Sequence, residues 1–126
     1  MRKFVLPWQT VFVDSTTVIS IPAGEWGEAD DVAKIGFELE MRAKTGVLEV
    51  ALGYETADDQ ATPDTAVAVT AYRTANGLTQ RGGLTDIAST TAGKKFIRAV
   101  YLVKLTSGST LTLAAVRGLV YIGKRS

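Results

Sequence analysis

The sequence predicts an all-β fold, an antiparallel β-sandwich of jelly-roll type with seven to eight strands. Three observations support this prediction. Apolar and polar residues alternate with a period of two in several segments, turn signals recur roughly every 8–12 residues, and no amphipathic helix of useful length is present. A small closed β-barrel is the alternative, because a barrel also uses alternating strands joined by tight turns.

Two segments in the first half show the alternation most clearly. In 34–44 and again in 47–56, apolar residues recur at every second position, with small or charged residues between them. Both are expected to be half-buried strands. The linker 44–46 has the length of a hairpin loop, so the two strands are expected to be antiparallel neighbours. The positions expected inside are Ile35, Phe37, Leu39, Met41, Leu48, Val50, Leu52 and Tyr54.

The segments before this pair are shorter. Residues 9–14 and 16–22 are expected to form two short strands, the second closed by Pro22. Residues 25–34 are expected to form a connection with one helical turn near Glu28.

The segments after the pair complete the sandwich. Strands are expected at 66–74 and 84–88, followed by a long, nearly continuous apolar strand at 95–105 that suits the centre of a sheet. In the last strand, 110–123, the alternation changes phase near Ala115, which predicts a β-bulge or bend there.

The chain length of 126 residues fits a single domain, expected to span 1–126. Residues 1–10 are either an arm that extends from the sandwich or its first strand. The N-terminus lacks the apolar core of an export signal, and the longest apolar stretch, 111–122, is too short for a bilayer and contains Arg117. We therefore expect a soluble protein made in the cytoplasm, without a membrane partner.

The chain contains neither cysteine nor histidine. This excludes a disulfide framework, a thiolate zinc site, a Ser-His-Asp triad and a near-neutral imidazole base. The one carboxylate pair on a clear strand face is Glu38 and Glu40, about 6.5–7 Å apart along a strand, which overlaps the spacing used for glycosidic cleavage. Charges on a solvent face, opposite cations such as Lys95 or Arg98, explain the pair better. We expect no enzymatic activity.

The densest acidic stretch is 53–65, GYETADDQATPDT. Its carboxylates could in principle supply oxygen ligands for Ca²⁺, but the EF-hand pattern is absent and turn chemistry accounts for the same residues. We expect the tip of a hairpin or a protein contact, with no metal or cofactor. The calcium alternative would use Glu55, Asp58, Asp59 and Asp64.

Charge is unevenly distributed along the chain. Residues 1–63 contain five Lys/Arg and eleven Asp/Glu, a charge of −6, whereas residues 64–126 contain nine and two, a charge of +7. Either strands from the two halves lie side by side, or the surface is dipolar and favours head-to-tail packing of copies. The basic residues are scattered and lack an aromatic-basic motif, so no nucleic-acid partner is expected.

Aromatic side chains allow a further hypothesis, a carbohydrate-binding β-sandwich module. Trp8 and Trp26 lie outside the clear strands and are the best candidates for a sugar-stacking surface. The tyrosines fall in apolar strands and are expected to be core or sheet-edge residues.

The strand order from 33 to 123, with the hairpin GYETADDQATPDTAVAV and the stretch GLTDIASTTAGKKFIRAVYLVKLTSGSTLTLAAV, resembles small β-sandwich structural proteins of tailed bacteriophages. These occur as capsid decoration (cement) proteins, head fibres, or small tail and neck components. The resemblance implies a non-enzymatic virion protein at the capsid surface, made in the host cytoplasm. It implies binding to the major capsid protein and a homo-oligomer, with a trimer favoured. The residues we expect at protein contacts are Phe4, Trp8, Trp26, Asp58, Asp59 and Arg81.

Overall fold

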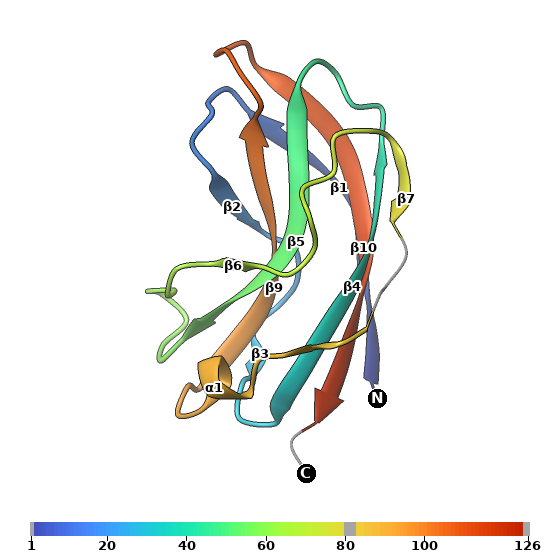
Figure 1. The fold of residues 1–126 in the computed structure, drawn as a ribbon. Coiled ribbons are helices and arrows are strands. Elements are labelled where there is room, and N and C mark those ends of the chain that lie inside the picture. Colours follow the sequence, from blue (N-terminus) through green and yellow to red (C-terminus); the bar gives the residue numbers. More distant parts are fainter. Residues whose placement is uncertain (1, 80–82, 125–126) are drawn as a thin grey trace.

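The computed structural model describes residues 2–79 and 83–124. They form two five-stranded antiparallel sheets packed face to face, which confirms the predicted β-sandwich (Figure 1). Within the described ranges, no helix is long and apolar enough to cross a membrane.

Each sheet combines strands from both halves of the chain. In sheet A the order is β1-β10-β4-β7, with β8 beside β4; in sheet B it is β2-β9-β5-β6, with β3 beside β9. Sheet A contains β1 (Arg2–Val13), β4 (Val32–Arg42), β7 (Gly77–Thr79), β8 (Thr85–Asp86) and β10 (Thr112–Lys124). Sheet B contains β2 (Ile19–Pro22), β3 (Gly27–Glu28), β5 (Leu48–Ala57), β6 (Val67–Ala68) and β9 (Phe96–Leu105), and a short helix, α1, spans Ala88–Thr91.

The core lies between the inner faces of the two sheets. All eight positions that the alternation in 34–44 and 47–56 placed inside are buried, and they form one cluster with inward residues of β9 and β10. Each large apolar side chain buried in this way contributes about 1.5–3 kcal/mol, so this cluster is the main source of stability.

The predicted hairpin between 34–44 and 47–56 is wrong. β4 lies in sheet A and β5 in sheet B, and the connection between them crosses from one sheet to the other. Ala43 and Gly46 both have positive φ angles in this connection, 54° and 61°. Alternation shows that a strand has one buried face, but it does not show which sheet the strand joins.

Strands from the second half of the chain occupy the centres of both sheets. β9 pairs with β2 and β5, which confirms the central position predicted for 95–105. β10 pairs along its length with β1 and β4.

The predicted phase change in β10 is also wrong. Burial keeps a period of two from Thr112 through Val116 to Val120. The irregularity lies on the neighbouring strand, where the register passes from Leu6↔Gly118 to Gln9↔Val116. Two residues of β1 therefore stand opposite one of β10, which is the geometry of a β-bulge. The described part of 1–10 belongs to β1 from Arg2 onward, so here it forms a strand of the sandwich.

Residues 66–74 form a less regular strand than predicted. Only Val67–Ala68 pair as a strand with β5, and Arg73 adds one isolated bridge to Val50. Between them the Leu52 N–H donates to the Thr70 hydroxyl, 2.9 Å away, instead of to a backbone carbonyl. A side chain thus replaces one ladder bond and interrupts the strand.

The predicted helical turn near Glu28 is absent from the described chain at that position. Residues Gly27–Glu28 are the short strand β3, which pairs with Phe96 and Ile97 of β9. The helical turn of this molecule, α1, follows β8 instead. Its Thr91 hydroxyl donates to the Val32 carbonyl oxygen at 2.6 Å and ties the turn to the start of β4.

Gly53 provides a test of how closely 66–70 packs on β5. A Cβ on residue 53 would lie 2.0 Å from the Val67 carbonyl oxygen. Gly53→Ala is therefore expected to displace this segment and to lower the free energy of unfolding by about 1–3 kcal/mol in urea denaturation. Gly83→Ala is the control, because a Cβ there would meet nothing within 4 Å. Equal losses in the two variants would contradict the packing described.

Candidate functional site

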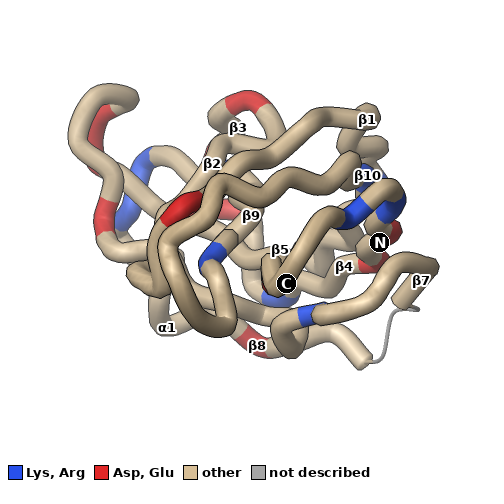
Figure 2. The backbone as a smooth tube through the Cα atoms, turned by 90° about the horizontal axis from the view of Figure 1, so that it is seen from above, with Lys and Arg blue, Asp and Glu red and all other residues tan. Residues whose placement is uncertain are grey.

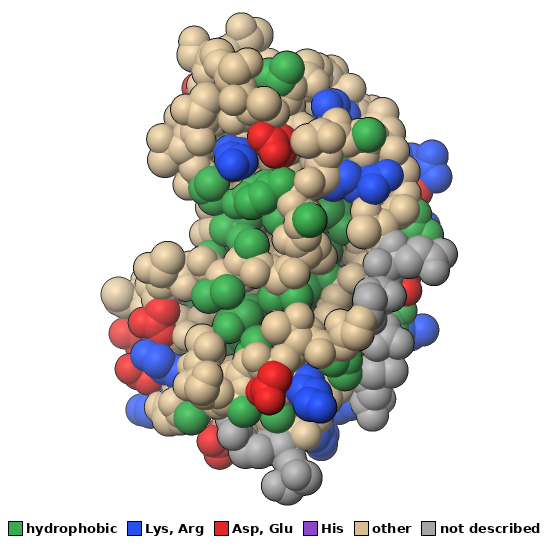
Figure 3. All heavy atoms as spheres, in the orientation of Figure 1, with side chains coloured by type: hydrophobic (Ala, Val, Ile, Leu, Met, Phe, Trp, Pro, Cys, Tyr) green, Lys and Arg blue, Asp and Glu red, His purple; other side chains and the backbone are tan. Residues whose placement is uncertain are grey.

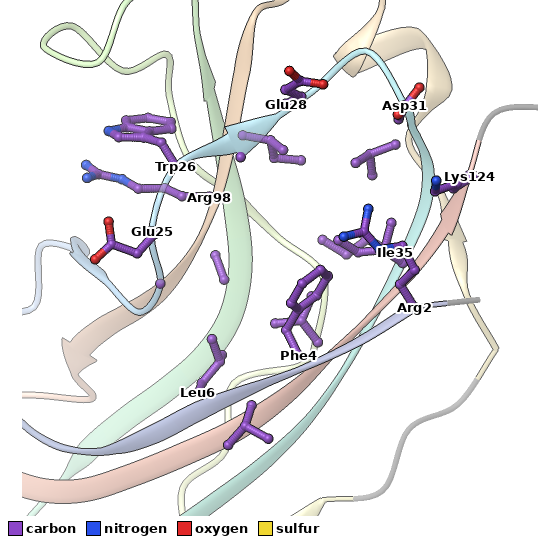
Figure 4. A pocket seen from close by; sticks show the side chains of 18 residues that line it. Arg2, Phe4, Leu6, Glu25, Trp26, Glu28, Asp31, Ile35, Arg98 and Lys124 are labelled. Atoms are coloured by element: carbon purple, nitrogen blue, oxygen red, sulfur yellow. The ribbon is translucent and has the colours of Figure 1, made fainter.

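A pocket of about 560 Å³ opens between the two sheets, at the edge where β1 faces β3 (Figure 4). Its floor is made by inward residues of both sheets. These are Leu6, Val32, Ile35, Ile97, Ala99 and Val120. This volume falls in the range of small-molecule sites, about 300–1,000 Å³, and the apolar floor suits an apolar group.

Charged side chains surround the mouth of this pocket. The Arg98 guanidinium lies 4.1 Å from the centre of the Trp26 ring, and its Nε donates to Glu55 at 2.5 Å. The Arg2 guanidinium lies 5.1 Å from the centre of the Phe4 ring. Both arginines are therefore already held by neighbouring groups of the chain. The carboxylates at the mouth are Glu25, Glu28 and Asp31.

The outer face of sheet A is a second candidate surface. It consists of the outward residues of β1, β10, β4 and β7, and several are apolar and exposed. Val5 is 70% exposed, Phe12 51%, Trp8 46% and Leu78 52%. A shallow hollow of about 270 Å³ lies in this face, between Val5, Leu78 and Leu119.

The outer face of sheet B differs, because the chain itself covers it. Residues 64–75 run along β5, and Ala66 and Tyr72 pack on a small cluster of Ala51, Val100 and Leu102. Figure 3 shows hydrophobic side chains across the middle of the molecule, with charged side chains above and below them.

A buried carboxylate organises the outer face of sheet A. Glu40 is only 4% exposed, and it accepts hydrogen bonds from Arg42 Nε at 2.6 Å and Arg117 Nε at 2.7 Å. The hydrogen bond from Arg117 lowers the pKa of Glu40 more than burial raises it, and Arg42 lowers it further. The Arg117 guanidinium also lies 5.0 Å from the centre of the Trp8 ring. One arginine thus joins the buried acid to the exposed indole.

The expected partners of the Glu38 and Glu40 pair are corrected by the structure. Arg117 lies across from Glu40, in place of Lys95 or Arg98. Glu38 accepts a hydrogen bond from the Tyr121 hydroxyl at 3.0 Å. Each carboxylate is thus engaged by a donor of the same face.

The carboxylates of 53–65 accept hydrogen bonds within turns or form ion pairs with basic side chains. Asp59 accepts from the backbone N–H groups of Ala61 and Thr62, which lower its pKa. Asp64 accepts from Lys94 at 2.9 Å and from the Thr56 hydroxyl, and its pKa is also lowered, most by Lys94. Glu55 is buried against Arg98, as described above. Among residues 2–79 and 83–124, no three or more acidic side chains come together as a metal site.

The structure distributes the six predicted contact residues over separate places. Trp8 lies on the outer face of sheet A, Phe4 and Trp26 border the pocket, and Asp58 and Asp59 are at an exposed loop tip. Arg81 lies outside the described residues. Each tryptophan has an arginine over its ring, which leaves less of either ring for stacking on a sugar.

Sequence reasoning missed several residues of the outer face of sheet A. These are Val5, Phe12, Leu78, Arg42 and Arg117. A signal for two of them was present, because residues 4–6 and 11–13 are apolar at successive positions and therefore expose one apolar side chain on each side of the strand.

Ion pairs between the two halves of the chain offset part of its charge asymmetry. Acidic residues of the first half meet basic residues of the second in the pairs Glu40–Arg117, Glu55–Arg98 and Asp58–Lys94. Figure 2 accordingly shows acidic and basic positions interspersed around the sandwich.

Comparisons with known proteins identify the fold and no family. No protein-family model and no curated protein matches the chain. A chain in the structure of infectious bursal disease virus, Gt strain, superposes with a TM-score of 0.65 and 14% identity, over 94% of this chain and 32% of that chain. The Gx strain gives 0.56 and 12%, over 97% and 32%, and the VP2 subviral particle of the same virus gives 0.56 and 11%, over 97% and 33%. The chain thus spans about a third of each of these chains.

Glu40 makes the stability of the fold pH-dependent. Its pKa is lowered in the folded state, so its stabilising contribution is present above the pKa of the unfolded chain and is lost as the pH falls through the lowered value. We expect chemical denaturation to show a loss of stability below about pH 5 that is smaller in Glu40→Gln. Glu38→Gln, on the same face, should retain the Glu40 contribution. If the free energy of unfolding depended on pH in the same way in the wild type and in Glu40→Gln, this assignment would be contradicted.

The inter-sheet pocket leads to a prediction about which buried alanines can be replaced by larger residues. Ala99 borders the pocket, whereas Ala51 is fully buried under the 64–75 segment. Ala99→Leu should leave the thermal midpoint unchanged or raise it, because the added atoms enter open space. Ala51→Leu should cost about 1–3 kcal/mol through overpacking. Comparable losses in both variants would show that the pocket is closed in solution.

Proposed function

We propose that this protein is a non-enzymatic structural component of a virus particle. The observation that carries the proposal is the likeness of nearly the whole chain to chains from infectious bursal disease virus particles. The likeness is one of fold, and a β-sandwich with covered and uncovered faces is suited to packing against other subunits.

Our more specific proposal is a capsid decoration protein. It binds the outer surface of the shell formed by the major capsid protein, stabilises that shell and associates with copies of itself. The exposed Trp8 with Arg117 beside it, on the outer face of sheet A, supports a protein-binding role, because Trp and Arg are enriched among the residues that dominate interface energetics. The engagement of Glu38 and Glu40 by structural donors also favours a binding role over catalysis.

Quantitative mass spectrometry of purified virions, from the virus whose genome encodes the chain, tests the proposal. We expect the chain in many copies, in fixed proportion to the major capsid protein. Brief denaturant treatment that releases it should leave shells that rupture at lower temperature, and adding back the purified protein should restore them.

Other outcomes of this experiment are also informative. A few copies per particle would favour a tail or neck component over decoration. Absence from the virion would overturn the structural role altogether. Detection with no effect on shell stability would overturn decoration and leave a different virion role.

A further inference from the structure

We propose that the N-terminal half of β1 binds an extended peptide segment of a partner protein. The segment pairs with β1 as an added strand and places apolar side chains in the inter-sheet pocket. This inference goes beyond the proposed function, because it names a site and a mode of recognition that hold whichever protein supplies the segment.

The first observation is that β1 is an edge strand of sheet A. β10 pairs with one side of it, and within the described ranges no strand pairs with the other side. The backbone hydrogen bonds of turns and loops in this part of the chain do not reach Arg2–Val13 either. In an antiparallel pair, every second residue directs its N–H and C=O away from the neighbouring strand. β1 thus presents a row of backbone donors and acceptors that another strand can use.

The regular part of this edge is Arg2–Leu6. These residues pair with β10 without a register shift, whereas the bulge follows between Leu6 and Gln9. The bulge contains Pro7, and both features oppose the addition of a strand. An added strand therefore has about five residues to follow, a length of roughly 16–17 Å.

The second observation is that the edges of the two sheets separate along the same stretch. At Gln9 they are joined, because its Nε2 donates to the Pro22 carbonyl oxygen at 3.3 Å. Next to Leu6 they are still close, since a Cβ on Gly24 would lie 3.4 Å from the Leu6 Cδ2. Towards Arg2 the inter-sheet pocket opens between them (Figure 4). The free edge of β1 is thus one border of the pocket mouth.

An inward-facing aromatic side chain is left uncovered at this mouth. Phe4 stands opposite Val120, which is 5% exposed, so both lie on the inner face of sheet A. Phe4 is nevertheless 42% exposed. Figure 4 shows Phe4 and Trp26 on opposite sides of the opening.

Small residues on the side of sheet B explain the open space. Gly24, Gly27 and Ala99 line the pocket there, and none has a side chain larger than a methyl group. The space between packed sheets is normally filled by interdigitating side chains from both inner faces. At this edge the chain itself leaves that space open.

The two observations together select an extended peptide as the occupant. A strand added to β1 uses the free backbone groups, and every second side chain of that strand falls on the inner face, beside Phe4 and over the pocket. Those side chains must be apolar, because the floor of the pocket is aliphatic and offers no hydrogen bond to a polar group. A hydrocarbon chain would fill the pocket but would leave the backbone groups of β1 unused.

NMR titration of the ¹⁵N-labelled protein with a short peptide tests the site. The probe is a heptapeptide of alternating threonine and leucine, acetylated and amidated at its ends. We expect it to shift the amide signals of Arg2–Leu6 and of the pocket residues, with a Kd of about 0.1–1 mM. A heptapeptide of threonine alone retains the preference for extended structure but lacks the apolar side chains. It should bind at least about tenfold more weakly.

Methylation of the peptide backbone tests the strand pairing itself. In an added strand, either the leucines or the threonines direct their N–H groups towards β1, and the other set directs them to solvent. N-methylation of one set should therefore abolish binding, and N-methylation of the other set should leave it unchanged. Loss of binding with both sets, or with neither, would overturn strand addition.

Two pairs of matched protein variants test the pocket. Ala99→Leu fills the pocket and should weaken peptide binding by roughly tenfold or more. Ala61→Leu adds the same atoms on an exposed loop and should bind like the wild type. Phe4→Ala should weaken binding several-fold, whereas Phe12→Ala removes an exposed aromatic ring from the outer face of the same strand and should have no effect. Circular dichroism confirms that each variant is folded.

The remaining outcomes assign the site to another occupant or remove it. No shift of the Arg2–Leu6 amides at about 1 mM alternating peptide overturns the proposal. Shifts of pocket residues by octyl glucoside, with none by the peptide, would assign the pocket to a hydrocarbon chain instead. A dimer in sedimentation that protects the Arg2–Leu6 amides from exchange would assign the edge to a second copy and overturn the peptide.

These results are independent of the virion inventory. Absence of the chain from the particle would overturn the structural role and leave the peptide site standing. Loss of peptide binding would leave the structural role untouched.

Discussion

The fold depends on the pairing of strands from opposite halves of the chain. β10 lies between β1 and β4 in one sheet, and β9 lies between β2 and β5 in the other. Neither sheet is continuous until the residues from Phe96 onward are in place, so the core forms from contacts distant in sequence. Topologies of this kind fold more slowly than those built on local contacts. The same pairing brings acidic residues of the first half beside basic residues of the second, as in the ion pairs Glu40–Arg117 and Glu55–Arg98.

The two outer faces of the sandwich differ in whether the chain itself covers them. On sheet B, Gly53 lets residues 66–70 approach β5 closely enough to cover the small cluster around Leu102. On sheet A, the apolar residues remain exposed around a buried carboxylate that two arginines neutralise. Burying a charge is costly unless it is paired, and here the pairing also orients Arg117 beneath its exposed aromatic neighbour. The uncovered face therefore combines exposed apolar side chains with arginines that are held by ion pairs to Glu40.

The sequence was sufficient for the class of fold and for the inward residues of β4 and β5, because apolar residues recur in both segments with a period of two. It was not sufficient for sheet membership. β4 and β5 are consecutive and alternate in the same way, yet a connection with two positive-φ residues sends them to different sheets. The interruption of the strand expected at 66–74 could not be predicted either. Nothing in the sequence shows that the Thr70 hydroxyl, in place of a backbone carbonyl, accepts the hydrogen bond from the Leu52 N–H. The candidate surfaces were predicted in part through Trp8 and Trp26, but the charged side chains around them depend on the register of β10 with β4 and on the position of β3.

The bulge in β1 links the fold to the candidate surface. Before it, odd-numbered residues such as Val5 point outward; after it, even-numbered residues such as Phe12 do so, while Val11 and Val13 are buried. A strand without the extra residue would have to place either Leu6 or Val11 and Val13 on the outside. One of the two residues at the bulge is Pro7, which has no N–H to donate and is tolerated at a bulge or edge. One added residue thus keeps both ends of β1 packed on the core and leaves Trp8 on the outer face beside Arg117. The bulge that makes the edge strand compatible with the core is thus also the feature that leaves Trp8 exposed.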